Sequence, residues 1–375
     1  MKVLHIISGG DTAGAKTHLI TLTKDLIKKV DMKILCFFAG EFYNEAKEMR
    51  LPVELLNQKS RYDFLVVKRI IKIIKDEKYN IVHCHGSRAN WFVFLAKPFI
   101  KVPLITTVHS DYKKDFEGVN LYRYYVYTGL NMIALRFFDY YIGVSPQFKS
   151  MLMERGFKAS KIFSVYNGVD FDEKLDYMDR KSFAKEHGLI EHIDKKWVGI
   201  AARLEPVKGL DVFINGAADA LKSKSDIHFV IAGAGAQKDE LENLCNTLNI
   251  KDKLTFIGQI KDMNSFYNAI DINNITSYSE SFSYVLLEGA RFRKPTISSA
   301  VGGIPELIKD EETGLLFESG KHEQYASCVL RLINDYEYAK KLGENLYEHA
   351  KANFSVENMT RQHVEIYKQI GNEIQ

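Results

Sequence analysis

The sequence predicts an α/β protein made of two doubly wound, Rossmann-like domains in tandem, facing a cleft. Two observations predict this fold class. Short apolar runs alternate with helix-length amphipathic stretches, and this alternation stops once and then restarts. The chain has 375 residues, which suits about two domains. Its apolar share of 46% is enough to build a core in each.

The first domain contains six apolar runs that are typical of buried parallel strands. They are residues 2–7, 32–38, 81–85, 103–109, 140–145 and 162–169. Helical patterns lie between them, and in residues 63–77 apolar side chains recur at intervals of three and four. Residues 170–196 are charged and contain no strand-like run, so we expect the first domain to span residues 1–170.

The alternation then restarts in the second domain, which we expect to span residues 171–356. The expected strands are residues 197–204, 227–235, 253–258, 271–276 and 295–300. An amphipathic pattern over residues 357–375 predicts one last helix. Ligands of doubly wound sheets bind at the carboxyl ends of the strands, so the cleft between the domains is the expected site.

Charge is distributed unevenly along the chain. Residues 1–170 contain 26 Lys and Arg against 16 Asp and Glu, which gives +10, and the remainder contains 25 against 32, which gives −7. A basic domain suits an anionic ligand, an anionic membrane surface or nucleic acid, or is only a solvated surface. Because the sequence contains no recognisable nucleic-acid module, we expect no nucleic-acid partner.

Two further features bear on localisation. No apolar run approaches the roughly 20 residues that a membrane span needs. The four cysteines, Cys36, Cys84, Cys245 and Cys328, have no pairing or metal-type spacing. They are typical of reduced thiols, so we expect a cytoplasmic protein.

Cations and glycines follow strands in both domains. Arg203 lies near the end of the expected strand 197–204, and Lys208 follows a short loop after it. A guanidinium fork and an ammonium group five residues apart suit a pyrophosphate, although such a pair on a loop is often only solvated. Gly10 follows the first strand and permits a tight turn and a close approach to a ligand. The surrounding sequence is neither G-x-G-x-x-G nor a Walker motif.

Histidines also end two strands of the first domain. His109 ends the run 103–109, where it can touch a substrate hydroxyl or only cap the strand. His83 and His85 lie on one face of a short strand, since side chains alternate along strands. The sequence offers them no obvious third ligand, so we expect no metal site.

The stretch 279–295, SESFSYVLLEGARFRKP, places carboxylates on both sides of a helix start. Ser281 or Ser283 suits the N-cap, so Glu280 lies in the loop and Glu288 more than one turn inside the helix. A helix N-terminus suits a phosphate. Carboxylates on either side of it suit the hydroxyls of a sugar and a ribose. The alternative is an ordinary buried helix with two surface acids.

The whole chain resembles the retaining glycosyltransferases of family 4 (glycosyl transferases group 1), which have the GT-B fold. Motifs in the family's order carry this resemblance. They are N-G-V-D at 167–170, R-x-x-x-x-K-G at 203–209, E-x7-E from Glu280 to Glu288, G-G-x-x-E at 302–306 and G-x-L at 314–316. Coincidence is a poor explanation for this many elements in one order.

The resemblance implies a role for each matching residue. Arg203 and Lys208 would hold the donor diphosphate and Glu288 the ribose, while Glu280 would contact the donor sugar. From the first domain, Gly10 would line the diphosphate and His109 would approach the sugar. At the start of the helix that carries Glu288, Ser283 and Val285 complete the expected donor site. The final helix would cross back onto the first domain.

This sequence departs from the family pattern in two places. The family often reads E-G-F-G where this chain reads Glu280-Ser281-Phe282-Ser283, and the loss of two glycines puts the sugar pose in doubt. The family's first-domain loop often runs from Gly-Gly straight into Ala-Glu. Here Gly10 is followed by Asp11-Thr12-Ala13-Gly14, so the contacts of that loop are less certain.

The implied activity is retaining transfer of a sugar from a nucleotide-diphosphate sugar, with a UDP-sugar favoured. The acceptor would be a hydroxyl of a saccharide or a lipid-linked molecule, in cell-surface polysaccharide or glycoconjugate synthesis. No cofactor and no metal are expected. The sequence offers no convincing nucleophile and base for double displacement, which favours front-face transfer. A sugar-nucleotide epimerase of related fold and a non-catalytic regulatory subunit remain alternatives.

Aromatic and basic residues mix in two stretches of the first domain, residues 88–101 and 112–137. Lys113, Lys114, Arg123 and Arg136 lie there among many Tyr and Phe. One hypothesis is that this basic surface docks peripherally on the inner face of an anionic membrane. The alternative is that the aromatic side chains belong to the core and the cations are scattered.

Overall fold

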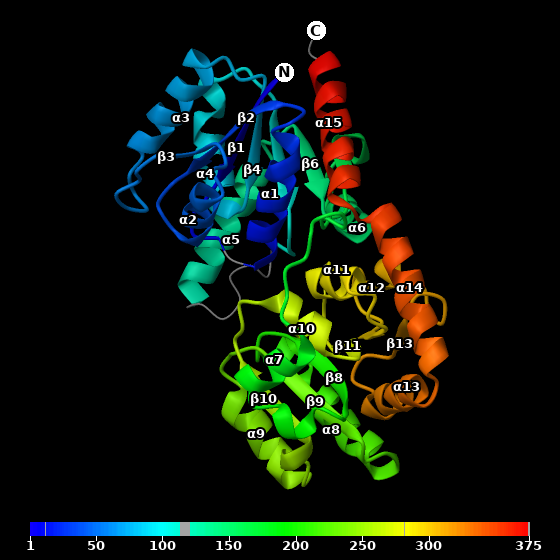
Figure 1. Cartoon of the computed structure of the whole chain (residues 1–375). Coiled ribbons are helices and arrows are strands. Elements are labelled where there is room, and N and C mark those ends of the chain that lie inside the picture. Colours follow the sequence, from blue (N-terminus) through cyan, green and yellow to red (C-terminus); the bar gives the residue numbers. More distant parts are fainter. Residues whose placement is uncertain (12, 113–120, 281, 374–375) are drawn as a thin grey trace. The chain divides into compact units, whose positions relative to one another are not determined.

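The computed structural model describes residues 1–11, 13–112, 121–280 and 282–373. The chain forms two compact units (Figure 1). Unit 1 consists of Met1–Asp170 and Phe354–Gln375, and unit 2 consists of Phe171–Asn353. The first boundary falls after Asp170, where the charged stretch of the sequence begins.

Unit 1 is built on a seven-stranded parallel sheet of order β3-β2-β1-β4-β5-β6-β7. Its strands are β1 (Lys2–Ile7), β2 (Asp31–Cys36), β3 (Val53–Leu55), β4 (Ile81–His85), β5 (Leu104–Val108), β6 (Tyr140–Gly143) and β7 (Ile162–Ser164). Every residue of β4 and β5 is buried, because helices cover both faces of a parallel sheet.

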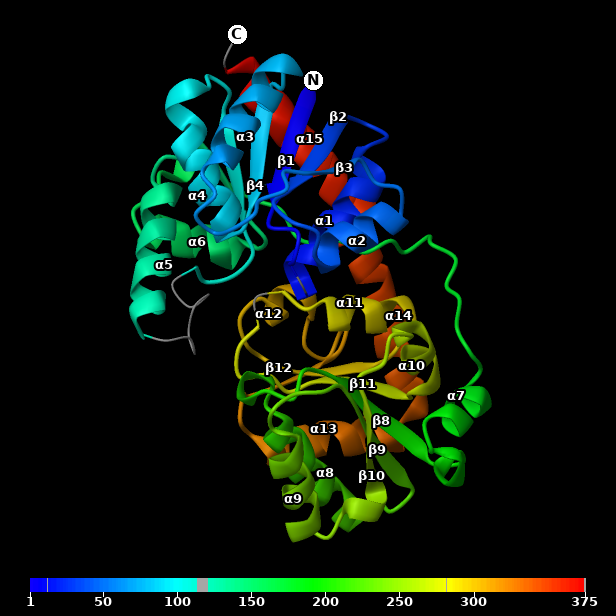
Figure 2. The ribbon, with the colours of Figure 1, turned by 90° about the vertical axis from the view of Figure 1, so that its left-hand side faces the viewer.

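Helices pack on both faces of this sheet (Figure 2). On one face lie α3 (Leu65–Asp76), α4 (Ser87–Ala96), α5 (Leu121–Leu135) and α6 (Pro146–Glu154). On the other face lie α1 (Ala13–Leu26), α2 (Glu41–Glu48) and α15 (Val356–Asn372). Helix α3 buries Val66, Ile70 and Ile74, which recur at the spacing of one helix face.

The last helix of the chain belongs to the core of unit 1. In Figure 1, α15 (red) lies beside α1 and β1 (blue). Its residues Met359, Ile366 and Ile370 pack in one cluster with Val3 and Ile7 of β1. Residues from the two ends of the chain therefore build one face of the same core.

Unit 2 is built on a six-stranded parallel sheet of order β10-β9-β8-β11-β12-β13. Its strands are β8 (Lys196–Ala201), β9 (Ile227–Ala232), β10 (Leu254–Gly258), β11 (Ile272–Ile275), β12 (Thr296–Ser299) and β13 (Leu315–Phe317). The order is that of a doubly wound sheet, and unit 1 shows the same order with one strand added.

Two hydrophobic clusters cover the faces of the second sheet. One includes α8 (Leu210–Ser223), α9 (Lys238–Thr247), α13 (His322–Asn334) and α14 (Tyr336–Asn353). The other includes α7 (Arg180–Glu186), α10 (Met263–Ala269) and side chains of α11 (Tyr284–Arg291). A short helix, α12 (Ile304–Leu307), follows β12.

The predicted fold class is confirmed: each unit is a doubly wound parallel α/β sheet. The sequence analysis missed β3 and β13. Each has only three residues, too few to show a periodic pattern, and each forms because a longer neighbouring strand offers it hydrogen-bonding groups. All four cysteines are free thiols. In the described part of the chain, no helix combines the length and apolarity that crossing a bilayer requires.

Candidate active site

The strand order reverses between β8 and β11, which places the loops that follow these two strands next to each other. Such a switch point is where doubly wound sheets bind ligands. The loop after β8 carries Arg203 and the 3-10 turn Pro206–Lys208. The loop after β11 carries Glu280. Two of the predicted motifs thus meet at one edge of the sheet.

Backbone contacts join these two loops. Gly209 has a φ of +59°, and a Cβ atom there would lie 2.1 Å from the carbonyl oxygen of Thr276. The hydroxyl of Thr276 donates to the carbonyl oxygen of Lys208 at 3.2 Å, and the N–H of Tyr278 donates to that of Val207 at 2.8 Å. Only glycine fits at position 209, which explains the K-G pair of the motif.

Lys208 and Glu280 form an ion pair at this switch point. Lys208 Nζ lies 2.6 Å from Glu280 Oε1, and the side chains are only 21% and 12% exposed. The hydroxyl of Ser277 donates to the same carboxylate oxygen at 2.8 Å. Arg203 instead pairs with Glu205 at 2.7 Å and is 62% exposed. The structure therefore brings Lys208 and Glu280 together and leaves Arg203 on the surface.

A glycine loop also holds the backbone of Glu280. Gly302 has a φ of +54°, and a Cβ atom there would lie 1.6 Å from the carbonyl oxygen of Glu280. The N–H of Gly303 donates to that same carbonyl oxygen at 3.3 Å. The two glycines of the G-G-x-x-E element therefore position Glu280, a role that the motif alone did not reveal.

We expect Gly302→Ala to lower the free energy of unfolding of unit 2 by roughly 2–4 kcal/mol, because it adds left-handed strain and a steric clash. Gly258→Ala is a matched control. Gly258 has a φ of +72°, but a Cβ atom there would meet nothing within 4 Å, so it should cost about 1 kcal/mol. Fluorescence of Trp197 during urea unfolding, in a Trp91→Phe background, measures both losses. Equal losses of unfolding free energy in the two variants would mean that the clash between a Cβ atom at position 302 and the Glu280 carbonyl costs no stability.

Helix α11 begins as the sequence predicts. Ser283 is its N-cap, and the Ser283 hydroxyl accepts from the N–H of Leu286 at 3.3 Å. Val285 is half-buried in the first turn, where backbone N–H groups have no partner inside a helix. Glu280 lies in the preceding loop and Glu288 in the second turn. Ser281, the other predicted cap, lies outside the described residues.

The carboxylate of Glu288, in the second turn of α11, is positioned by a hydrogen bond from Tyr267. The hydroxyl of Tyr267 donates to Glu288 Oε2 at 2.9 Å. Burial raises the pKa of Glu288, while the Tyr267 bond and the charge of Arg291 act in the opposite direction. Tyr267 fixes one oxygen of the carboxylate. The alternative interpretation, of two surface acids, is wrong for both residues, since Glu288 is half-buried and the Glu280 side chain is only 12% exposed.

Unit 1 has a cavity at its own switch point, between the loops that follow β1 and β4. Its volume is about 540 Å3. Gly10 and His109 both line it, as do Asp11, Arg88 and Asn131, which the sequence analysis did not single out. A sequence signal was available for Arg88, because it lies in a polar run directly after β4. The strand ends at a switch point face ligands. Beside Gly10, the ring of Phe38 leaves no room for a side chain.

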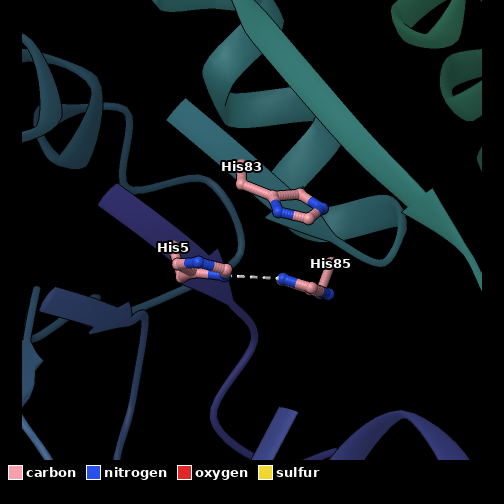
Figure 3. Close-up of side chains that lie close together, drawn as sticks. All are labelled: His5, His83 and His85. Carbon is pink, nitrogen blue, oxygen red and sulfur yellow. Dashed lines mark hydrogen bonds between the residues drawn. The ribbon is translucent and has the colours of Figure 1, made fainter. Parts of the chain in front are cut away.

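Six histidines gather on one face of the sheet, and two of them, His85 and His109, line this cavity. His5 of β1 is paired in register with His83, and His85 follows on the same face of β4, as Figure 3 shows for these three. The other three are His18, His109 and His363. The expectation that His83 and His85 lack a third ligand is therefore wrong, because β1 and three further segments supply imidazoles that are distant in sequence.

Most ring nitrogens in this histidine cluster lie close to neutral partners. His5 Nδ1 lies 3.0 Å from His85 Nε2, and His85 Nδ1 lies 3.3 Å from His109 Nε2. His83 lies 2.7 Å from both the Tyr367 hydroxyl and the Thr107 hydroxyl. The contacts form a chain that leads from the cavity into the core.

Burial keeps the cluster uncharged. It lowers the pKa of His5 to about 3 and that of His109 to about 4. His109 is therefore a neutral hydrogen-bonding group at pH 7. Within the described residues, two sets of three imidazole nitrogens come within 4.8 Å of one another: His5, His83 and His85, and His18, His85 and His109. Neutral imidazole is the form that binds a metal ion, but a metal at the first set would displace existing hydrogen bonds.

Two family models match the chain. The model described as Glycosyltransferase Family 4 matches residues 12–173, and the model described as Glycosyl transferases group 1 matches residues 184–349. The second match contains Lys208, Glu280 and Gly302, which meet at one switch point, and Glu288 of the helix that follows. The chain belongs to the group 1 glycosyltransferases.

Curated relatives of this glycosyltransferase match along its whole length. The GalNAc-alpha-(1->4)-GalNAc-alpha-(1->3)-diNAcBac-PP-undecaprenol alpha-1,4-N-acetyl-D-galactosaminyltransferase of Campylobacter jejuni is 26% identical, over 99% of this chain and 99% of that protein. The O-antigen biosynthesis glycosyltransferase WclY of Escherichia coli is 24% identical, over the full length of both chains.

A solved structure has the same fold. Anabaena Alr3699/HepE, in complex with UDP, superposes with a TM-score of 0.84 at 21% identity, over 98% of this chain and 100% of that chain. This glycosyltransferase therefore has the two-domain GT-B fold.

Proposed function

We propose that this glycosyltransferase moves a sugar from a nucleotide-diphosphate sugar, with UDP as the favoured nucleotide, to an acceptor hydroxyl with retention of configuration. The observation that carries the proposal is the pairing of Lys208 with Glu280 beside the start of α11. A cation and a helix N-terminus suit a diphosphate. The carboxylate suits sugar hydroxyls. The complexes of Anabaena HepE with UDP and with UDP-glucose support the choice of donor.

In the proposed reaction, the bond between the anomeric carbon and the diphosphate oxygen breaks, and a bond to the acceptor oxygen forms on the same face. The acceptor proton passes to the departing diphosphate. Lys208, Arg203 and the N-terminus of α11 would stabilise the charge that develops on the diphosphate. This scheme requires no metal. Glu280 pairs with Lys208, so donor binding would exchange this carboxylate for a phosphate.

A screen of nucleotide sugars by thermal shift identifies the donor, and NMR of the product then gives the anomeric configuration. We expect a donor with an axial bond at the anomeric carbon to give a product with an axial bond at the same carbon. An inverted product would contradict retention. Net epimerisation of the sugar nucleotide without an acceptor would favour an epimerase instead. No turnover with any donor and acceptor would favour a non-catalytic subunit.

We expect the two carboxylates to have different roles: Glu288 binds the ribose, and Glu280 acts on the sugar. Glu288→Gln should weaken the binding of free UDP about tenfold, because a neutral acceptor replaces a charge-assisted bond to the ribose, while the amide still accepts from Tyr267. Glu280→Gln should leave UDP binding unchanged or tighter, because Lys208 loses its partner, and should lower turnover. Calorimetry with UDP and initial rates measure both effects. Equal weakening of UDP binding would contradict the division.

We propose a saccharide or lipid-linked acceptor and a peripheral contact of unit 1 with an anionic membrane. Of the aromatic side chains in the two mixed stretches, Phe99, Tyr125 and Phe137 are exposed, whereas Phe92 and Tyr112 are buried in the core. The core interpretation therefore accounts for only part of this surface. Lys113 and Lys114 lie outside the described residues, and so does the side chain of Arg123. Co-sedimentation with anionic vesicles at low and high salt tests the contact.

A further inference from the structure

Two cavities adjoin each other in unit 1. The polar cavity, of about 540 Å3, contains His109 and Asp11. A second cavity of about 300 Å3 shares with it the residues Ser87, Arg88 and Asn131. The remaining lining of the second cavity is Arg61 and six apolar or aromatic side chains: Tyr62, Phe64, Trp91, Phe92, Tyr127 and Leu130. A polar compartment thus borders an apolar one.

Two arginines face the apolar cavity. Arg88 donates to Gln58 Oε1 at 3.2 Å, and its guanidinium lies 4.9 Å from the ring centroid of Phe38. Arg61 donates to the hydroxyl of Tyr127 at 3.1 Å. These partners are neutral, and neither arginine forms an ion pair with a carboxylate of the described residues. Guanidinium groups so placed favour a bidentate anion such as phosphate.

The charges of the two arginines also act on each other. Burial lowers the pKa of Arg88, and the positive charge of Arg61 lowers it further, while Asp11 acts in the opposite direction from the polar cavity. Like charges in a partly desolvated place repel, and an anion bound between them removes that repulsion. The border between the cavities therefore favours a negatively charged group.

The rim of the apolar cavity has exposed aromatic side chains that a hydrocarbon chain can cover. At its rim, Tyr62 is 79% exposed and Phe64 is 52% exposed. Exposed aromatic side chains around an apolar hollow gain free energy when a hydrocarbon covers them, at about 25 cal/mol per Å2. A fully hydrophilic saccharide would leave this hollow uncovered and would bring no anion to the two arginine charges.

We propose that the two cavities form an acceptor site for a saccharide that is linked through phosphate to a hydrocarbon chain. Its phosphate binds Arg61 and Arg88, and its hydrocarbon fills the hollow lined by Phe64 and Trp91. Its reacting hydroxyl lies in the polar cavity with His109. This inference rests on the proposed transferase function and specifies the class of acceptor.

Calorimetry with dodecyl phosphate, below its micelle concentration, tests the site. We expect Arg61→Met and Arg88→Met each to weaken dodecyl phosphate at least tenfold, since each removes a charge-assisted contact. Arg50→Met is the matched control, because Arg50 is exposed and lines neither cavity. Arg61 is also exposed, so its variant folds even if the Arg88 variant does not. Dodecyl maltoside, which has the same chain without phosphate, should bind weakly and equally to all variants.

The outcomes separate this inference from the proposed function. Unchanged dodecyl phosphate binding in both arginine variants, with UDP still bound, would overturn the site and leave the transferase proposal standing. If anionic phospholipid vesicles bind with the same dependence on Arg61 while alkyl-phosphate saccharides are not glycosylated, the occupant is membrane lipid and the acceptor assignment is wrong. A lower rate of transfer to an alkyl-phosphate saccharide in both the Arg61→Met and the Arg88→Met variants supports the acceptor assignment.

Discussion

Replacing Lys208 by methionine should lower kcat about 10²–10³-fold, because under the proposed function it removes a charge that stabilises the departing diphosphate. Free UDP should bind about tenfold more weakly, the loss expected for one charge-assisted contact. Methionine keeps most of the apolar length of the lysine side chain and removes its charge. Steady-state kinetics and calorimetry with UDP measure the two losses separately.

The ion pair with Glu280 supplies the control for this variant. Lys208→Met alone leaves a mostly buried carboxylate with Ser277 as its remaining donor, which costs stability as well as activity. The double variant Lys208→Met, Glu280→Gln should recover stability but not turnover. Arg203→Met is a comparison at an exposed site, where we expect a loss in UDP binding of about tenfold. Full recovery of turnover in the double variant would mean that Lys208 acts only on the fold.

Lowering the pH from 7 to 5.5 should destabilise unit 1 by several kcal/mol. Burial lowers the pKa values of all six clustered histidines, to about 3 for His5 and about 4 for His363, so they stay neutral in the folded chain. The unfolded chain takes up protons below pH 6.5. Between pH 6.5 and about 4, the unfolded state therefore holds more protons, and stability falls as the pH falls.

The expected size of this effect is large. At pH 5.5, each such histidine costs roughly 1.4 kcal/mol, so six approach the whole stability of an ordinary domain. The two tryptophans separate the units, since Trp91 lies in unit 1 and Trp197 in unit 2. A Trp197→Phe variant reports on unit 1 alone, and a Trp91→Phe variant on unit 2.

One substitution tests the source of the acid sensitivity. His363 Nε2 is buried and has no hydrogen-bond partner among the residues that the structure describes, so His363→Leu removes a titrating group while it roughly preserves the size of the side chain. We expect the proton uptake on unfolding at pH 5.5 to fall by about one. His322→Leu, at a half-exposed site in unit 2, is the control. An unfolding midpoint of unit 1 that is the same at pH 7 and 5.5 would show that the cluster is not responsible.

The sequence by itself predicted the long strands of both sheets and the motifs of the expected donor site. Apolar runs bounded by helical periods predicted the long strands, because a strand that is buried on both faces must be apolar along its length. Ser283 as the N-cap and Glu288 inside α11 were predictable for a similar reason, since a cap and its helix are neighbours in the chain. The three-residue strands β3 and β13 were not predictable, because only pairing with β2 and β12 makes them strands.

Only the tertiary structure decided which distant residues meet. The sequence separates Lys208 from Glu280 by 72 residues and His5 from His83 by 78, and no local pattern records either contact. Strand order brings both pairs together, since β8 lies beside β11 and β1 beside β4. The same is true of the space that Gly302 leaves for Glu280 and of the cavity that Arg61 and Arg88 share. Local chemistry fixes which elements form, whereas long-range packing of those elements fixes which side chains act together.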